Sequence, residues 1–223
     1  GGMKMTIKEK LTEKVSGVKS LATAALLAAT IALSPTPATA GGSVELMAGH
    51  QSTTLDTKVS TEVAEKTGLF IRQMTTSTPE GEVSYFGLAD LSYKLVGGLD
   101  VVGEIQAAPG MGVIPRAGLQ HFGKVGDLAV YALATVKTMD HPDGEVVVSL
   151  SYTPKLGESI DLLMSLEDLT SVGKEGHQFS IQKLRLGATL MEKYHIGAAA
   201  NLTELGPDGS FGYDIGGFVG VDL

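Results

Sequence analysis

The chain lacks cysteine and tryptophan, and it is poor in aromatic residues, which make up 5% of its 223 positions. Without cysteine no disulfide can support the fold, so its stability must come from packing and backbone hydrogen bonds. No apolar stretch reaches the roughly 20 residues that a membrane-spanning helix needs. Because the hydrophobic content of 43% is also ordinary, the composition does not indicate a helical membrane protein. The length suffices for one domain with a sizeable core or for one small barrel.

Residues 1–40 have the pattern of an export signal. Five lysines give this segment a basic start, namely Lys4, Lys8, Lys10, Lys14 and Lys19. The apolar run Leu21–Leu33 follows, and its length is that of a signal-peptide core rather than of a membrane span. A Ser-Pro-Thr-Pro break and a small-residue site then predict cleavage near Ala40. Gly1 and Gly2, ahead of Met3, are typical of a non-native remnant or a mis-assigned start.

Basic residues are few once the export segment is set aside. Residues 1–40 hold five lysines and two glutamates, so residues 41–223 keep 12 basic and 23 acidic residues, a net charge of −11. A surface with this charge repels a phosphate backbone, which disfavours nucleic acid as a partner.

After Ala40 the sequence pattern contains no amphipathic helix of normal length. Segments bounded by Gly, Pro, Asp or Asn instead alternate apolar and polar residues with a period of two, which is typical of β-strands with one apolar face. A change of phase between Ile181 and Leu184 predicts a β-bulge near Gln182 and Lys183. The twelve predicted strands are 43–50, 53–63, 68–77, 82–95, 98–107, 112–122, 127–138, 144–153, 158–168, 177–190, 193–203 and 210–223.

The last segment, Phe211–Leu223, shows this alternation over its whole length. Its odd positions are apolar or small, Phe218 is the exception among its even positions, and the chain stops on the apolar parity. The pattern resembles the closing strand of bacterial outer-membrane β-barrel proteins, which ends on an apolar residue, usually Phe, and is read by the barrel-assembly machinery. Here the terminal residue is Leu223. The resemblance implies an assembly signal formed by Phe211, Tyr213, Ile215, Val219, Val221 and Leu223.

This resemblance covers the export segment and residues 43–223. It implies an all-β fold, an antiparallel up-and-down transmembrane β-barrel of about 12 strands (ten being the alternative count), after an N-terminal signal peptide. The domains would be the signal peptide 1–40 and the barrel 41–223, with the outer membrane of a Gram-negative-type envelope as the location. The lipid bilayer and the barrel-assembly machinery would be partners. Short connections such as 154–157 alternate with longer ones such as 169–176, as periplasmic turns and outer loops do.

Alternation alone does not decide which face of the barrel meets water. In a soluble barrel the apolar face fills the interior, whereas in a membrane barrel the charged face lines the lumen. The export signal, the even strand count, the connections and the closing strand together favour the membrane barrel. The predicted lumen-lining residues are Asp90, Asp100, Glu104, Arg116, Asp161, Glu167, Arg185, Lys193 and Asp214. The same parity also carries Asp56, Lys58, Arg72, Lys94 and Lys137.

The sequence contains no motif for catalysis or cofactor binding. The five histidines lie in five different segments, none with zinc-ligand spacing, and no serine lies in a Gly-x-Ser-x-Gly motif. His195 and Ser180, on neighbouring predicted strands, are the one pair worth inspecting. We therefore predict no enzyme activity, no cofactor and no metal site.

The resemblance implies a porin-like channel for passive diffusion of small solutes. The acidic excess predicts a mild preference for cations, because fixed carboxylates raise the local cation concentration. One alternative is a closed barrel in the outer membrane, whose lumen is filled by charge networks and whose loops bind partners. The other is a secreted soluble β-barrel or sandwich that binds an apolar ligand. The direction in which the apolar face points separates this last alternative from the other two.

Overall fold

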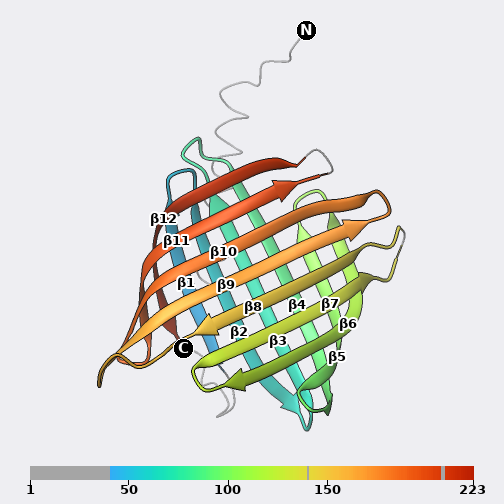
Figure 1. Ribbon diagram of the computed structural model, residues 1–223. Coiled ribbons are helices and arrows are strands. Elements are labelled where there is room, and N and C mark those ends of the chain that lie inside the picture. The colour runs from blue at the N-terminus through green and yellow to red at the C-terminus, as the bar shows by residue number, and fades with distance from the viewer. Residues whose placement is uncertain (1–40, 140, 207–208) are drawn as a thin grey trace.

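The computed structural model describes residues 41–139, 141–206 and 209–223. The predicted export segment and its cleavage site lie outside these residues and stay predictions. Twelve strands form one closed antiparallel barrel in which consecutive strands are neighbours (Figure 1). Within the described residues, no helix is long and apolar enough to cross a membrane.

The strands agree closely with the predicted segments, although β6 and β9 continue further than their predicted ends. Their bounds are β1 (Gly41–Gly49), β2 (Thr53–Ala64), β3 (Thr67–Ser77), β4 (Val83–Val96), β5 (Leu99–Ala108), β6 (Gly112–Val125), β7 (Leu128–Lys137), β8 (Gly144–Tyr152), β9 (Ile160–Gly173), β10 (Gly176–Leu190), β11 (Tyr194–Leu205) and β12 (Ser210–Asp222).

Strand β12 closes the barrel. In register, Val219 pairs with Ile196 of β11 on one side and with Leu46 of β1 on the other. Closure leaves no strand edge with unpaired backbone groups, a condition that a sheet in lipid must meet. The predicted up-and-down barrel of twelve strands is therefore confirmed, and the alternative count of ten is wrong.

The connections follow the predicted difference in length between the two ends only in part. The predicted loop 169–176 belongs largely to β9, so that only Lys174 and Glu175 join β9 to β10. At the end where β1 begins and β12 ends, the connection 153–159 is longer than any connection at the opposite end. The predicted rule of short turns at one end and longer loops at the other therefore fails at these two connections, although the remaining turns at the first end are short.

The bulge in β10 lies between His177 and Phe179, not near Gln182 and Lys183. The pairing of β10 with β9 is regular from Phe179 onward. Phe179 and Ile181 share the inward side of the strand with Lys183, because side chains alternate between the two faces. The apparent change of phase arises because apolar residues also point into the lumen.

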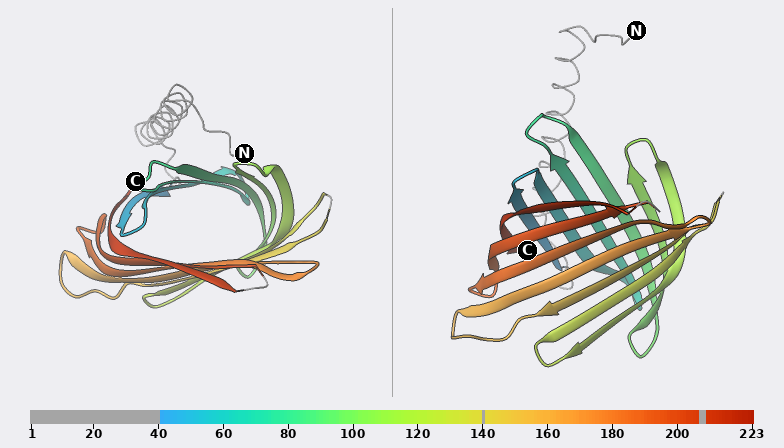
Figure 2. Two further views of the ribbon diagram at one scale, coloured as in Figure 1. Left: turned by 90° about the horizontal axis from the view of Figure 1, so that it is seen from above. Right: turned by 45° about the horizontal axis from the view of Figure 1, so that its top comes forward.

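The barrel is flattened. Seen end-on it is an oval, with strands β2–β4 along one long side and β9–β11 along the other (Figure 2). At several glycines a side chain would collide with the neighbouring strand: a Cβ on Gly216 would meet the backbone of Ala48, and one on Gly118 that of Ala134. Glycine at such positions allows a close approach of the neighbouring backbone.

Candidate functional site in the barrel lumen

Apolar side chains face out of the barrel and charged side chains face in. On β5, Ile105 is 54% exposed while its neighbour Glu104 is 3% exposed, and on β12 the figures are 55% for Ile215 and 8% for Asp214. Large apolar side chains on the outer wall are exposed, whereas buried polar residues outnumber buried apolar ones among the described residues. This arrangement is the reverse of a soluble barrel, so the soluble alternative is wrong.

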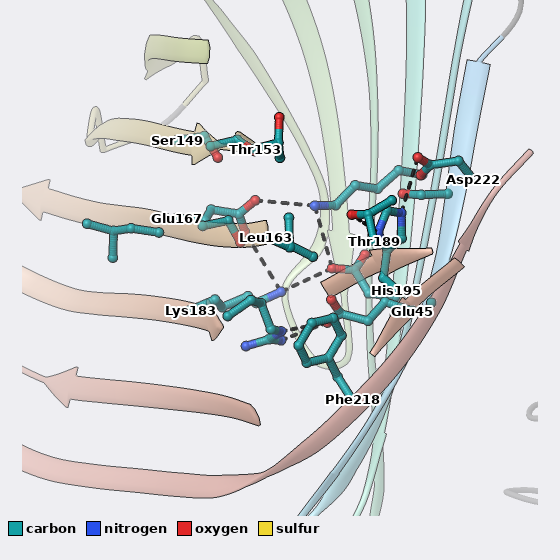
Figure 3. Close-up of a pocket in the computed structure, with 18 of the residues that line it drawn as sticks. Glu45, Ser149, Thr153, Leu163, Glu167, Lys183, Thr189, His195, Phe218 and Asp222 are labelled. Carbon is teal, nitrogen blue, oxygen red and sulfur yellow. Dashed lines mark hydrogen bonds and ion pairs between the residues drawn. The ribbon is translucent and has the colours of Figure 1, made fainter. Parts of the chain in front are cut away.

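Five charged side chains cross the middle of the lumen, and we call them the central bridge. Asp56 and Lys58 of β2 and Arg72 of β3 come from one wall, and Glu167 of β9 and Lys183 of β10 from the other. Arg72 Nη2 lies 2.5 Å from Asp56 Oδ2 and 2.8 Å from Glu167 Oε1. Lys183 Nζ lies 3.2 Å from Asp56 Oδ2, and Lys58 Nζ lies 3.4 Å from Glu167 Oε2. Figure 3 shows Lys183 and Glu167 within these dashed contacts.

The central bridge ties opposite walls together. Strands β2 and β3 lie across the closed barrel from β9 and β10, and the flattened section brings them within reach of ion pairs (Figure 2). Three cationic groups meet two carboxylates, which leaves one excess positive charge. This part of the lumen is thus polar and held by charge rather than by apolar packing.

Arg185 makes a second contact between wall strands. Its Nε and Nη2 donate to Oε1 of Glu45 at 2.9 and 2.8 Å, and its Nη1 donates to Oδ1 of Asn201 at 3.0 Å. The guanidinium also lies 5.7 Å from the ring centroid of Phe218, a cation–π geometry. Phe218 is buried with Met47 in an apolar cluster. Phe218, the one large apolar residue at an even position of the closing strand, therefore points inward and packs in the lumen.

A cavity of about 570 Å³, which we call the vestibule, adjoins the central bridge at the end where β1 begins and β12 ends. Much of its wall is lined by hydroxyl groups, from Ser43, Ser149, Ser151, Thr153, Ser165 and Thr189. His195 lies at its edge, with Nδ1 at 3.0 Å from Thr189 Oγ1 and Nε2 at 3.1 Å from Asp222 Oδ2 (Figure 3). Such a wall can exchange hydrogen bonds with water or with a hydroxylated solute.

Acidic side chains gather on the wall formed by β4–β8. Gln106 Nε2 donates to Glu104 Oε1 at 2.9 Å and to Glu145 Oε2 at 2.7 Å. Arg116 Nη1 lies 2.5 Å from Asp143 Oδ1 and 3.2 Å from Glu145 Oε1, and its Nε lies 3.6 Å from Glu104 Oε1. One guanidinium therefore serves three carboxylates on this wall.

The predicted lumen residues occupy several separate places rather than one patch. Glu167 belongs to the central bridge, Asp161 lines the vestibule, and Asp100 accepts a hydrogen bond of 2.9 Å from Gln120. Asp214 is inward but lies at the barrel end of the β1–β2 connection, where it accepts hydrogen bonds from the backbone of Gln51 and the hydroxyl of Ser52. The remaining inward members are Asp90, Glu104, Arg116 and Arg185.

Lys193 does not line the lumen. It lies exposed in the connection between β10 and β11, which occupies the residues between Leu190 and Tyr194. The predicted strand began one residue too early, which put Lys193 on a wall.

Several lumen residues escape the predicted set. The sequence pattern predicts a bulge near Lys183, although Lys183 has the same odd parity as the inward Arg185. Glu45, in the first strand, has the same inward parity as Met47. Parity alone could have found both residues. Their partners across the lumen depend on the closed barrel and had no signal in the sequence.

His195 and Ser180 do not meet. The β10–β11 register pairs Thr189 with His195 but Ser180 with Glu204, and the Ser180 hydroxyl contacts His177 Nε2 at 2.9 Å instead. Within the described ranges, no group of three or more His, Cys, Asp or Glu residues could hold a metal ion.

A closed twelve-stranded barrel with an apolar exterior and a charged lumen defines an outer-membrane-type β-barrel protein. Among solved structures, the chain is similar to the KdgM porin in complex with disordered oligogalacturonate, with a TM-score of 0.48 and 11% identity over 82% of this chain and 98% of that one. It is also similar to a loop L8 deletion mutant of OmpT, an outer membrane protein of Vibrio cholerae, with a TM-score of 0.35 and 9% identity over 82% and 97% of the two chains. Neither a protein-family model nor a curated protein matches the chain.

Proposed function

We propose that the chain is a narrow outer-membrane channel for the passive diffusion of small solutes, with a mild preference for cations. The observation that carries this proposal is the central bridge: ion pairs between Asp56, Arg72, Glu167 and their neighbours cross the lumen, and the vestibule lies beside them. Charged side chains are costly to bury in an apolar interior, but they are readily accommodated where water reaches them.

The direction of charge selectivity follows from the acidic excess. The net charge of −11 for residues 41–223 includes the carboxylates on the wall of β4–β8, whereas the central bridge carries one excess positive charge. Cations would therefore be enriched along the acidic wall, and the bridge would limit how strongly they are preferred.

The location and the assembly route belong to the same proposal. The apolar outer wall needs a lipid bilayer, and the export segment would direct the chain to the bacterial outer membrane. The assembly-signal side chains of β12 supply outward apolar groups: Phe211, Tyr213, Ile215 and Val219 are all at least half exposed. They suit recognition by the barrel-assembly machinery. We propose no enzymatic activity for the protein.

The second candidate is a closed barrel with a structural role. The central bridge favours it, because ion pairs that span the lumen between β3 and β9 could block passage instead of lining it. The two candidates share a location and differ in conductance.

A planar-bilayer recording of the purified barrel separates the two candidates. The channel predicts small single-channel steps in KCl and a reversal potential that favours K⁺ in a salt gradient. Lys183→Gln removes the excess positive charge and leaves two cations facing two carboxylates, so conductance and cation preference should both rise. Lys155→Gln makes the same change at an exposed position outside the lumen, and it should alter neither property. A parent and a Lys183→Gln variant that are both silent would establish the closed barrel.

A further inference from the structure

Asp90 and Glu104 form a pair of buried carboxylates on the inner wall. They are direct register partners on β4 and β5, both point into the barrel, and each is only 3% exposed. Two like charges placed opposite each other on one face of a sheet repel. Something other than their own pairing must therefore offset the cost of holding them together.

The cationic side chain nearest to Glu104 is already engaged. Arg116 donates Nε to Thr135 Oγ1 at 2.8 Å and Nη1 to Asp143 Oδ1 at 2.5 Å, and it also faces Glu145 at 3.2 Å. Gln106 satisfies Glu104 Oε1 through its amide, but a neutral donor leaves the charge in place. Glu104 shares one cation with two other carboxylates.

Asp90 has no cation at all in the part of the chain that the structure describes. No ion pair reaches it, and its Oδ1 is buried without a hydrogen-bond partner. The nearby Tyr131 hydroxyl donates to Gln120 rather than to Asp90. An unsatisfied carboxylate oxygen in such surroundings costs more than almost any other buried polar group.

We propose that Asp90 and Glu104 form a binding site for a hard cation in the lumen. Their carboxylate oxygens are the ligands that Ca²⁺ and alkali ions prefer, and Ca²⁺ tolerates irregular geometry with water completing its shell. Since three acidic or histidine groups do not converge here, the site binds weakly and reversibly, as an ion in transit requires. In its link to permeation this inference rests on the proposed channel, but the binding itself does not.

Thermal unfolding of the folded barrel in detergent, monitored by circular dichroism, tests binding without any current. The probe is CaCl2, compared with choline chloride at equal ionic strength, because choline screens charge but is too bulky for the pair. The parent should gain a few degrees in Tm in CaCl2, since a ligand that binds only the folded state stabilises it. The variant Asp90→Asn/Glu104→Gln should show no gain. Asp100→Asn, on the same wall but held by Gln120, is the matched control and should behave like the parent.

Each outcome decides the inference. An equal Tm gain in the parent and in Asp90→Asn/Glu104→Gln, or no gain in the parent, overturns it and leaves a proton shared by the two carboxylates as the explanation. If the double variant does not fold, Asp90→Asn alone provides the same comparison.

In bilayers, CaCl2 should reduce the K⁺ current of the parent and of Asp100→Asn but not of the double variant. A specific Tm gain with a silent bilayer would keep the cation site and reject the channel.

Discussion

Arg72 of β3 and Glu167 of β9 form an ion pair across the lumen, with Nη2 and Oε1 2.8 Å apart. Both side chains are largely shielded from water, with 11% and 18% of their surface exposed. The pair joins the two long sides of the flattened barrel, so it acts on the shape of the lumen as well as on its charge.

Breaking the central bridge on one side should destabilise the barrel. Glu167→Gln leaves Lys58, Arg72 and Lys183 facing Asp56 alone, and removal of one partner of a buried pair costs about 3–5 kcal/mol. Water in the lumen should reduce this to about 2 kcal/mol, measured by urea unfolding in lipid vesicles. Glu167→Gln/Lys183→Gln should recover most of the loss. Glu192→Gln, at an exposed connection, should change nothing. If Glu167→Gln and Glu192→Gln lowered the free energy of unfolding equally, charge pairing would not be the cause.

Substitutions on the outer wall should be far more costly than those in the vestibule. Leu186 on β10 is 55% exposed and faces outward. Leu186→Arg should lower the free energy of unfolding by about 2–4 kcal/mol, as arginine does near the middle of a bilayer. Ser149→Arg, in the vestibule wall, should be tolerated. Both can be measured by unfolding from vesicles, and similar losses would contradict the assignment of the two faces.

The close approach of β1 and β12 at Gly216 should not tolerate a side chain. Gly216→Ala places a Cβ against the backbone of Ala48, which cannot move without disturbing the ladder. Crowding of this kind costs about 1–3 kcal/mol. Gly103→Ala is the matched control, since a Cβ there meets nothing within 4 Å. Heat-modifiable migration on gels reports the folded fraction. If the Gly216→Ala barrel were as heat-resistant as the Gly103→Ala barrel, β1 and β12 would have moved apart to accommodate the added Cβ.

The closing strand should govern assembly through its outward apolar residues. Leu223→Phe restores the terminal residue that the resemblance implies, so it should raise the folded fraction in outer membranes at equal expression. Val219→Asp puts a carboxylate on the outward face of β12, where Val219 is 50% exposed, and it should lower that fraction. Ser210→Asp, at the other end of the strand, is the control. Folded and unfolded forms can be compared by heat-modifiable migration of membrane fractions.

The period-two pattern was enough to predict twelve strands, whereas the pairing of the last strand with the first was predicted from the barrel that the resemblance implies. Alternation is a local property of each segment. Neighbouring residues such as Ile105 and Glu104, or Ile215 and Asp214, can therefore be assigned to opposite faces of a strand without any knowledge of the fold. The outward placement of the assembly-signal residues follows in the same way. Errors arose where an apolar residue points inward, as Phe179 does, or where a strand begins later than predicted, as β11 does at Tyr194.

The tertiary structure alone decided which inward residues meet. The barrel is flattened (Figure 2), and Asp56 and Arg72 on one long side reach Lys183 and Glu167 on the other. The isolation of Asp90 is likewise a property of closure, because the sequence does not show that Arg116 is used up by Asp143 and Glu145. Whether a segment forms a strand can be predicted from the alternation of residues within that segment. Contacts across the lumen depend instead on the curvature and register of all twelve strands together.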